Sequence, residues 1–362
     1  MTMIIQRLLY DTHMHSQHND YFLYKNIILQ NGEQPIVEKC PCTCIILSNL
    51  LKENNNILFE DFNEPMLRLV FEELAAIKSS VVKTRYAFAL LSEGRVVTWG
   101  NSVFGGDSSR VAESLSGGVV DLVKTCCSFA AVTESGRVVT WGHEEYGGDS
   151  SQVAGKLACG VVEVVPTNYA FAALKDSGQV VTWGDEEFGG DSSDVAETLA
   201  SGVIKVVATW RAFAALTEGR RVVTWGEEEA GGDSSKVAEQ LASGVVNIMA
   251  TDLAFAVLKE DGQVVTWGNP RWGGYSEAKE LASGVMQVTA TLGAFAAVVK
   301  GGRVVTWGYD IYGGDSSDVA EELESGVVNV VSMNNIRFVA WKDDGSVVEW
   351  GEDLHDDPYT YM

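Results

Sequence analysis

Residues 201–242 read SGVIKVVATWRAFAALTEGRRVVTWGEEEAGGDSSKVAEQLA, and this stretch decides the fold because similar copies follow one another along the chain. Its Trp-Gly dipeptide recurs at Trp99, Trp141, Trp183, Trp225, Trp267, Trp307 and Trp350. The spacings are 42, 42, 42, 42, 40 and 43 residues. Self-similarity at a near-constant period is typical of repeat folds, in which each copy forms one structural unit.

Each copy contains three short runs that favour β-strands. In the quoted copy they are residues 203–209, 212–216 and 221–225, rich in β-branched and aromatic residues and bounded by turn residues. A tight turn with glycine separates the second run from the third, which predicts a hairpin. The linker G-G-D-S-S-x-V-A-E-x-L fits a capped helical turn, and equally a short outer strand or an irregular crossing.

Three or four short strands repeated seven times predict an all-β fold, a seven-bladed β-propeller. One blade cannot bury both faces of its sheet, whereas neighbouring blades cover them. The seven repeated tryptophans are therefore predicted to be structural residues between blades. The glycine after each one permits a sharp turn. A long solenoid is the alternative, but seven copies suit ring closure.

The repeat divides the chain into three parts. Residues 1–61 are predicted to be a partly ordered N-terminal extension, residues 62–353 the propeller and residues 354–362 a tail. Only eleven residues follow the seventh Trp-Gly, so the last blade lacks its linker. VFEEL at 70–74 resembles VAEEL at 319–323. Residues 62–76 are therefore predicted to act as a latch that packs against the seventh blade.

Composition and charge exclude several classes of protein. Lysine plus arginine total 26 and aspartate plus glutamate total 50 among 362 residues, a net charge of -24. Such a polyanion repels phosphate, so we expect no nucleic-acid partner. No apolar run approaches ~18 residues, so no membrane span is predicted. The N-terminus makes a poor signal peptide, and the six cysteines are too clumped for a disulfide framework, so we expect a cytoplasmic or nuclear monomer.

The motifs predict no catalytic site, no cofactor and no metal. G-G-D-S-S occurs five times, but no histidine stands at a constant offset to activate its serines. G-x-x-x-x-G-G resembles half of a phosphate loop, but Gly-Asp stands where the lysine and hydroxyl residue belong. Cys40, Cys42 and Cys44 lack the spacing of a structural zinc site. The nearby histidines are His13, His15 and His18.

Comparison of the seven copies separates a constant framework from a variable surface. The pair of residues after each first strand varies, and so do the four residues after each Trp-Gly. Because the chain reverses at each turn of an antiparallel sheet, both variable sets should lie at the same end of the blades. Function is most often carried by loops on a rigid scaffold. We therefore expect the partner to bind at this end.

The predicted binding surface combines an acidic arc with aromatic and arginine anchors, the residue types that dominate binding hot spots. The candidates are Glu144, Glu145, Asp185, Glu186, Glu187, Trp210, Arg211, Glu227, Glu228, Glu229, Trp272 and Tyr312. An acidic arc attracts a basic protein through electrostatic steering. In the alternative interpretation, the aromatic residues fill gaps between blades and the acids only solvate the rim.

The repeat resembles that of the regulator of chromosome condensation family of seven-bladed propellers. The resemblance rests on G-x-V-V-T-W-G, the Gly-Gly that follows, S-G-V-V-x-V-x-A and A-F-A-A-L, and covers about residues 66–351. The short period and the S-G-V opening look most like the compact bacterial members that inhibit β-lactamases. The resemblance implies the propeller fold and a habit of protein binding, without specifying one activity.

The resemblance leaves other functions open beside a non-enzymatic binding scaffold. One is guanine-nucleotide exchange on a small GTPase, which uses a propeller face and leaves no catalytic motif. A ubiquitin-ligase-associated adaptor is another, although no HECT-like domain follows the propeller. A proteinaceous enzyme inhibitor is disfavoured by the lack of a signal peptide. The chain also departs from the family, because pairs such as Tyr86-Ala87 stand where Gly-His is usual.

Overall fold

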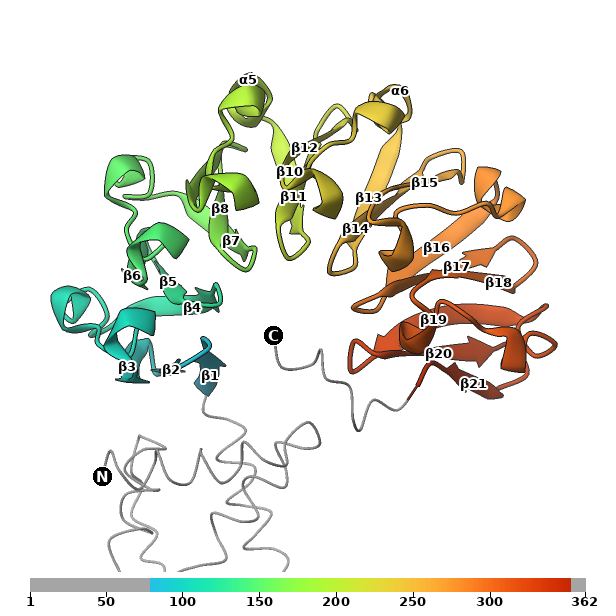
Figure 1. The fold of residues 1–362 in the computed structure, drawn as a ribbon, viewed down its shortest axis with the longest axis horizontal. Coiled ribbons are helices and arrows are strands. Elements are labelled where there is room, and N and C mark those ends of the chain that lie inside the picture. Colours follow the sequence, from blue (N-terminus) through green and yellow to red (C-terminus); the bar gives the residue numbers. More distant parts are fainter. Residues whose placement is uncertain (1–78, 353–362) are drawn as a thin grey trace, which may run out of the picture.

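The computed structural model describes residues 79–352, which form seven three-stranded antiparallel sheets that follow one another along an arc (Figure 1). The chain is an all-β, seven-bladed propeller, as the repeat predicts. Within the described part, the first and seventh sheets lie at the two ends of the arc. The predicted N-terminal extension, the latch, the tail and Cys40, Cys42 and Cys44 lie outside the described residues.

Each blade keeps its strands in sequence order, and the first strands of neighbouring blades contact one another around the inside of the arc (Figure 1). The strands are β1 (Ser79–Lys83), β2 (Ala87–Ser92), β3 (Arg95–Gly100), β4 (Val119–Lys124), β5 (Ser128–Thr133), β6 (Val138–Gly142), β7 (Val161–Pro166), β8 (Ala170–Lys175), β9 (Val180–Gly184), β10 (Val203–Ala208), β11 (Ala212–Thr217), β12 (Val222–Gly226), β13 (Val245–Ala250), β14 (Ala254–Lys259), β15 (Val264–Gly268), β16 (Val285–Ala290), β17 (Ala294–Val299), β18 (Arg303–Gly308), β19 (Val327–Met333), β20 (Arg337–Lys342) and β21 (Val347–Trp350).

The linkers form short helical turns, which decides between the alternatives that their sequence left open. The turns are η2 (Ser102–Phe104), η3 (Ser109–Val111), η4 (Glu144–Tyr146), η5 (Ser151–Val153), η6 (Glu186–Gly190), η7 (Ser193–Val195), α5 (Ala196–Leu199), η8 (Glu228–Ala230), η9 (Ser235–Val237), α6 (Ala238–Leu241), η10 (Pro270–Trp272), η11 (Lys279–Ala282), η12 (Asp310–Tyr312) and η13 (Ser317–Val319). None of the helices in residues 79–352 has the length and apolar character needed to cross a membrane.

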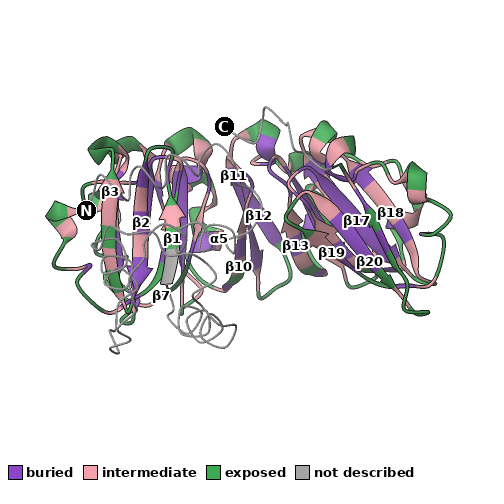
Figure 2. Ribbon diagram, turned by 90° about the horizontal axis from the view of Figure 1, so that it is seen from below, coloured by how far each residue is buried: buried purple, intermediate pink, exposed green. Residues whose placement is uncertain are grey.

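Buried residues fill the middle strands, while exposed residues gather in the turns at the two ends of the sheets (Figure 2). In the fourth blade Phe213 pairs with Trp225 across β11 and β12, and their rings stack 5.2 Å apart. The Trp225 indole nitrogen donates to the Gly189 carbonyl oxygen of the preceding loop at 3.1 Å. The Trp-Gly motif thus joins each blade to the one before it.

Gly189 shows why the loop between blades needs glycine. Its φ is +95°, and a Cβ there would lie 2.6 Å from Cδ2 of Phe213 in the next blade. Five other repeated tryptophans are buried and make the same type of bond as Trp225, namely Trp141, Trp183, Trp267, Trp307 and Trp350. Trp99 is half-buried, and its indole nitrogen has no hydrogen-bond partner within residues 79–352.

A second set of bonds joins the blades where each first strand ends. The backbone N–H of one residue donates to the carbonyl oxygen of its counterpart in the next blade, at 2.7 to 2.8 Å. The bonds run from Arg85 to Cys126, Cys126 to Asn168, Asn168 to Trp210, Trp210 to Asp252, Asp252 to Leu292 and Leu292 to Asn335. We call these six bonds the backbone belt. Because they join backbone atoms, they hold one end of the scaffold together whatever side chains the variable positions carry.

Candidate functional site

The two variable sets of residues lie together at one end of the blades, which we call the variable face. Tyr146, in the loop after a Trp-Gly, contacts Tyr169, which follows the next first strand, with ring centroids 5.1 Å apart. Trp210 and Trp272 join the same two sets across the fourth and fifth blades at 5.9 Å. The variable face is therefore a continuous surface built by several blades.

Within the described residues, the loop after the Trp-Gly has the same backbone shape in each of the first six blades. A residue with extended backbone begins a short helical turn, and a glycine with positive φ ends it. In the third blade the side chain of Asp185 accepts a hydrogen bond from the Glu187 backbone N–H at 3.0 Å. Such side-chain capping satisfies an otherwise unpaired donor at the start of a turn. Asp185 thus has a structural task in addition to its charge.

Six acidic residues of the predicted arc are exposed on three consecutive blades. They are Glu144, Glu145, Glu186, Glu187, Glu228 and Glu229, in η4, η6 and η8. The corresponding positions carry Ser102 and Val103 in the first blade and Pro270 and Arg271 in the fifth. The sixth blade carries a single acidic residue there, Asp310, so the pairs of acidic residues are found on the second, third and fourth blades.

Arg211 and Glu227 form an ion pair with each other, which their sequence positions did not reveal. The Arg211 Nη1 atom lies 3.0 Å from Glu227 Oε1, and the guanidinium carbon lies 5.5 Å from the centroid of the Phe188 ring. Glu227 is half-buried by this arrangement. Both residues therefore contact each other on the variable face, and their contact with a partner stays a prediction.

Four aromatic rings form a second feature, which we call the tryptophan cluster. It consists of Trp210, Trp272, Tyr309 and Tyr312, and Trp272 contacts the other three at centroid distances of 5.7 to 5.9 Å. The Arg271 guanidinium lies over Tyr309 at 4.0 Å. Tyr312 is only 4% exposed and belongs to the core between the sixth and seventh blades. Tyr312 is therefore a packing residue, whereas the three other rings keep partial exposure.

Asp252 lies in the backbone belt beside the tryptophan cluster and was not among the predicted site residues. It accepts from Trp210 and donates to Leu292 through its backbone, but it is only 7% exposed and its Oδ2 atom has no partner within residues 79–352. Burial raises the pKa of its carboxyl to about 8. An unpartnered buried carboxyl is costly and so marks a candidate functional position.

Cys126 and Cys127 are a second feature that sequence reasoning missed. Both are free thiols at the variable end of the second blade, and their sulfur atoms lie 2.7 Å apart. The hydrogen bond between the thiols raises the pKa of Cys126 and lowers that of Cys127. Like Asp252, the pair replaces the residues that other copies carry after the first strand. Departure from the repeat at that position is the signal that could have found all three.

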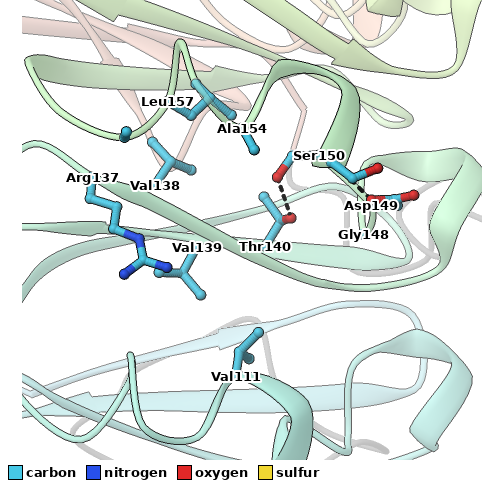
Figure 3. Close-up of a pocket in the computed structure, with 12 residues that line it drawn as sticks. Val111, Arg137, Val138, Val139, Thr140, Gly148, Asp149, Ser150, Ala154 and Leu157 are labelled. Carbon is cyan, nitrogen blue, oxygen red and sulfur yellow. Dashed lines mark hydrogen bonds between the residues drawn. The ribbon is translucent and has the colours of Figure 1, made fainter.

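A pocket of about 560 Å³ lies beside β6 of the second blade, lined by that strand and by the linkers before and after the blade (Figure 3). Figure 3 shows Ser150 directed at Thr140, and their hydroxyl oxygens lie 2.9 Å apart. Asp149 accepts from the Ser151 backbone N–H at 2.8 Å. The same pairs recur in other blades. These groups therefore stabilise the linker of the repeat, and the pocket does not stand out as a site.

Two further aspartates have a pKa that is lowered by hydrogen bonds within turns. In Asp233 the hydrogen bond from the Ser235 backbone N–H lowers the carboxyl pKa, and Ser346 acts likewise on Asp344 through its hydroxyl. Among residues 79–352, no three His, Cys, Asp or Glu side chains come together in a way that could hold a metal ion. The variable face is thus the most distinctive surface of the described chain.

The chain is similar to solved structures of other proteins at low sequence identity and low TM-score. No protein-family model and no curated protein sequence matches the chain. Solved structures similar to it include Prp20p from Saccharomyces cerevisiae, with 17% identity, TM-score 0.40, and 63% of this chain and 71% of that one covered. Human WBSCR16 has 16% identity and TM-score 0.39, covering 70% and 84%. Yeast RCC1 (Prp20) bound to Kap60 has 18% identity and TM-score 0.40, covering 76% and 80%.

Proposed function

We propose that this protein is a non-enzymatic binding scaffold that holds a basic protein partner on its variable face. The observation that carries the proposal is the row of six exposed acidic residues on three consecutive blades, beside a cluster of partly exposed aromatic rings. Charges of one sign steer the encounter, and aromatic anchors slow dissociation. The backbone belt keeps these groups in place without depending on their identity.

The test reverses charge on the variable face and compares it with the opposite end. One variant changes Glu186, Glu187, Glu228 and Glu229 to lysine. The control changes Glu134, Asp176, Glu218 and Asp261 to lysine, which are exposed in the hairpin turns. Both variants gain the same charge, so a difference in binding reports position and not net charge.

We expect the face variant to lose a basic partner that the wild type and the control variant capture from cell extract. With the purified partner, the association rate should fall at low salt and the difference should fade at high salt, because the Debye length shrinks from about 10 Å at 0.1 M to about 3 Å at 1 M. Equal capture and equal association rates for both variants would contradict the proposal.

The alternative function is regulation of a small GTPase, which the similar structures suggest. The yeast neighbour Prp20p has been characterised for its binding to Gsp1p and histones, and these partners are stated for that protein alone. Nucleotide-release assays over a panel of small GTPases separate the two functions. Faster release that is lost in the face variant would favour an exchange factor over a passive scaffold.

A further inference from the structure

Six exposed apolar residues occupy the same position in six consecutive blades. They are Val120, Val162, Ile204, Val246, Met286 and Val328, with exposed fractions between 47% and 66%. A solvated strand position normally carries polar residues at least as often as apolar ones. An apolar residue in all six blades therefore indicates a surface that is covered, because contiguous exposed apolar patches mark interaction sites. We call these six residues the apolar ring.

The backbone explains why the residues of the apolar ring point out of the sheets. In β10 the register with β11 shifts between Val203 and Lys205, so Ile204 lies in a β-bulge. The same shift occurs in the other five blades. A bulged residue is left unpaired and re-aims its side chain. The pattern is thus a repeated feature of the innermost strands.

The apolar ring lies at the end of the blades opposite to the variable face. Ile204 is near the start of β10, beside the hairpin turn whose Glu218 N–H donates to the Gly202 carbonyl at 2.8 Å. Lys205 donates from Nζ to Asn247 Oδ1 at 2.7 Å, which links the bulges of neighbouring blades. The six residues therefore follow one another around the inside of the arc.

We propose that residues 1–61 of the same chain bind the apolar ring. Residues 1–78 precede β1, and β1 begins at the same end of the blades as the apolar ring. Residues 1–61 also contain the apolar stretches that such a surface would bind, at 4–10 (IIQRLLY), 21–24 (YFLY), 26–29 (NIIL) and 44–47 (CIIL). A short covalent tether gives these stretches a millimolar effective concentration, which favours them over a free partner.

Photo-crosslinking of the full-length protein tests this inference directly. The probe p-benzoylphenylalanine replaces Ile204 in the apolar ring, and in a control it replaces the exposed Glu229 on the variable face. Mixing chains with light and heavy isotopes separates bonds within one chain from bonds between chains. We expect the probe at 204, and not the probe at 229, to crosslink to residues 1–61 of its own chain. Crosslinks between chains, equal crosslinks from both probes or none at all would overturn the inference.

A substitution experiment gives a second measurement on the full chain. Changing Val162, Ile204 and Val246 to threonine nearly preserves side-chain shape and β-propensity but weakens an apolar contact. We expect protease cleavage within residues 1–61 to become about tenfold faster, with the melting temperature of the blades unchanged. The control changes the exposed Val103 and Val347 to threonine. Equal cleavage rates in the wild type and both variants would overturn the inference, and neither experiment depends on a partner at the variable face.

Discussion

At the scale of single residues, the variable face combines groups that are already satisfied with groups that are not. Arg211 and Glu227 neutralise each other, and Tyr312 belongs to the core. Asp252, Arg211 and His143 each keep one buried polar atom (Oδ2, Nε and Nδ1) that has no hydrogen-bond partner within the described residues. Trp272 lies between these cases, because it is half-buried and contacts three other rings.

Asp252 predicts an unusual dependence of stability on pH. Its folded-state pKa of about 8 lies above the ordinary aspartate value of 3.8, so the folded protein binds more protons than the unfolded one between these values. Stability should therefore fall as pH rises from 5 to 8, by on the order of 3 kcal/mol for this group. Asp252→Asn should remove this fall. Urea unfolding at both pH values measures it.

The control for this prediction is Asp233→Asn. Hydrogen bonds lower the pKa of Asp233, so its carboxyl is ionised in both states above pH 5 and the variant should keep the wild-type slope. If Asp252→Asn also keeps the wild-type slope, the buried carboxyl is not protonated in the folded protein and the assignment fails.

Trp272→Ala should lower the free energy of unfolding by about 2 kcal/mol, less than the roughly 3–5 kcal/mol of a fully buried tryptophan, because the Trp272 ring is only partly buried. Tyr275→Ala in the same blade is the matched control. Tyr275 is 62% exposed, so its loss should change stability by about 0.5 kcal/mol or less. Chemical denaturation of both variants measures the difference. Equal stability would show that Trp272 is a free surface residue.

At the scale of the element, each repeat consists of a hairpin, a loop and a helical turn. These elements contact one another through residues at fixed positions of the repeat. The cross-strand pair of Phe213 and Trp225 forms the centre of one blade, and the loop glycine of the preceding blade packs on it. The serine and threonine pairs of the linker fasten the helical turn to the third strand. The elements of each repeat therefore depend on contacts within their own blade and on contacts with the loop of the preceding blade.

Gly189→Ala should destabilise the protein by about 3 kcal/mol. A positive φ is unfavourable for alanine, and its Cβ would approach the Phe213 ring within 2.6 Å, so strain and overpacking add. Gly155→Ala in the linker of the second blade is the control, since a Cβ there meets nothing within 4 Å. Thermal unfolding of both proteins checks this. Similar melting temperatures would mean that the loop moves away without cost.

At the scale of the whole molecule, the two ends of the arc differ from the six junctions between blades. Val81 and Val97 of the first blade are 58% and 54% exposed. Their counterparts in the second blade, Leu122 and Val139, are buried against the first. The face of the first blade that points away from the second is thus more exposed than the faces at the six junctions, within the described residues.

The predicted latch implies different outcomes for two truncations. Deletion of residues 1–76 should lower the melting temperature sharply, because the seventh blade then loses the segment that is predicted to pack against it. Deletion of residues 1–55 should have a much smaller effect, since residues 62–76 remain. Differential scanning calorimetry of both truncations measures this. Equal melting temperatures would show that the end blade needs no latch.

The sequence by itself determined the number of blades, the hairpin in each blade and the positions of the variable loops. These properties depend on local patterns that the period repeats, so each copy carries the full information. The linker was ambiguous because its capping residues suit several short structures, and only packing against the neighbouring blade selects the helical turn.

Only the tertiary structure decided which residues of the variable face are free to act. The pairing of Arg211 with Glu227, the burial of Tyr312 and the unpartnered carboxyl of Asp252 depend on contacts between loops that are far apart in the sequence. The bulge that exposes Ile204 is likewise a property of strand register. Strand patterns fix which residues alternate, but burial and charge pairing arise only when neighbouring blades come together.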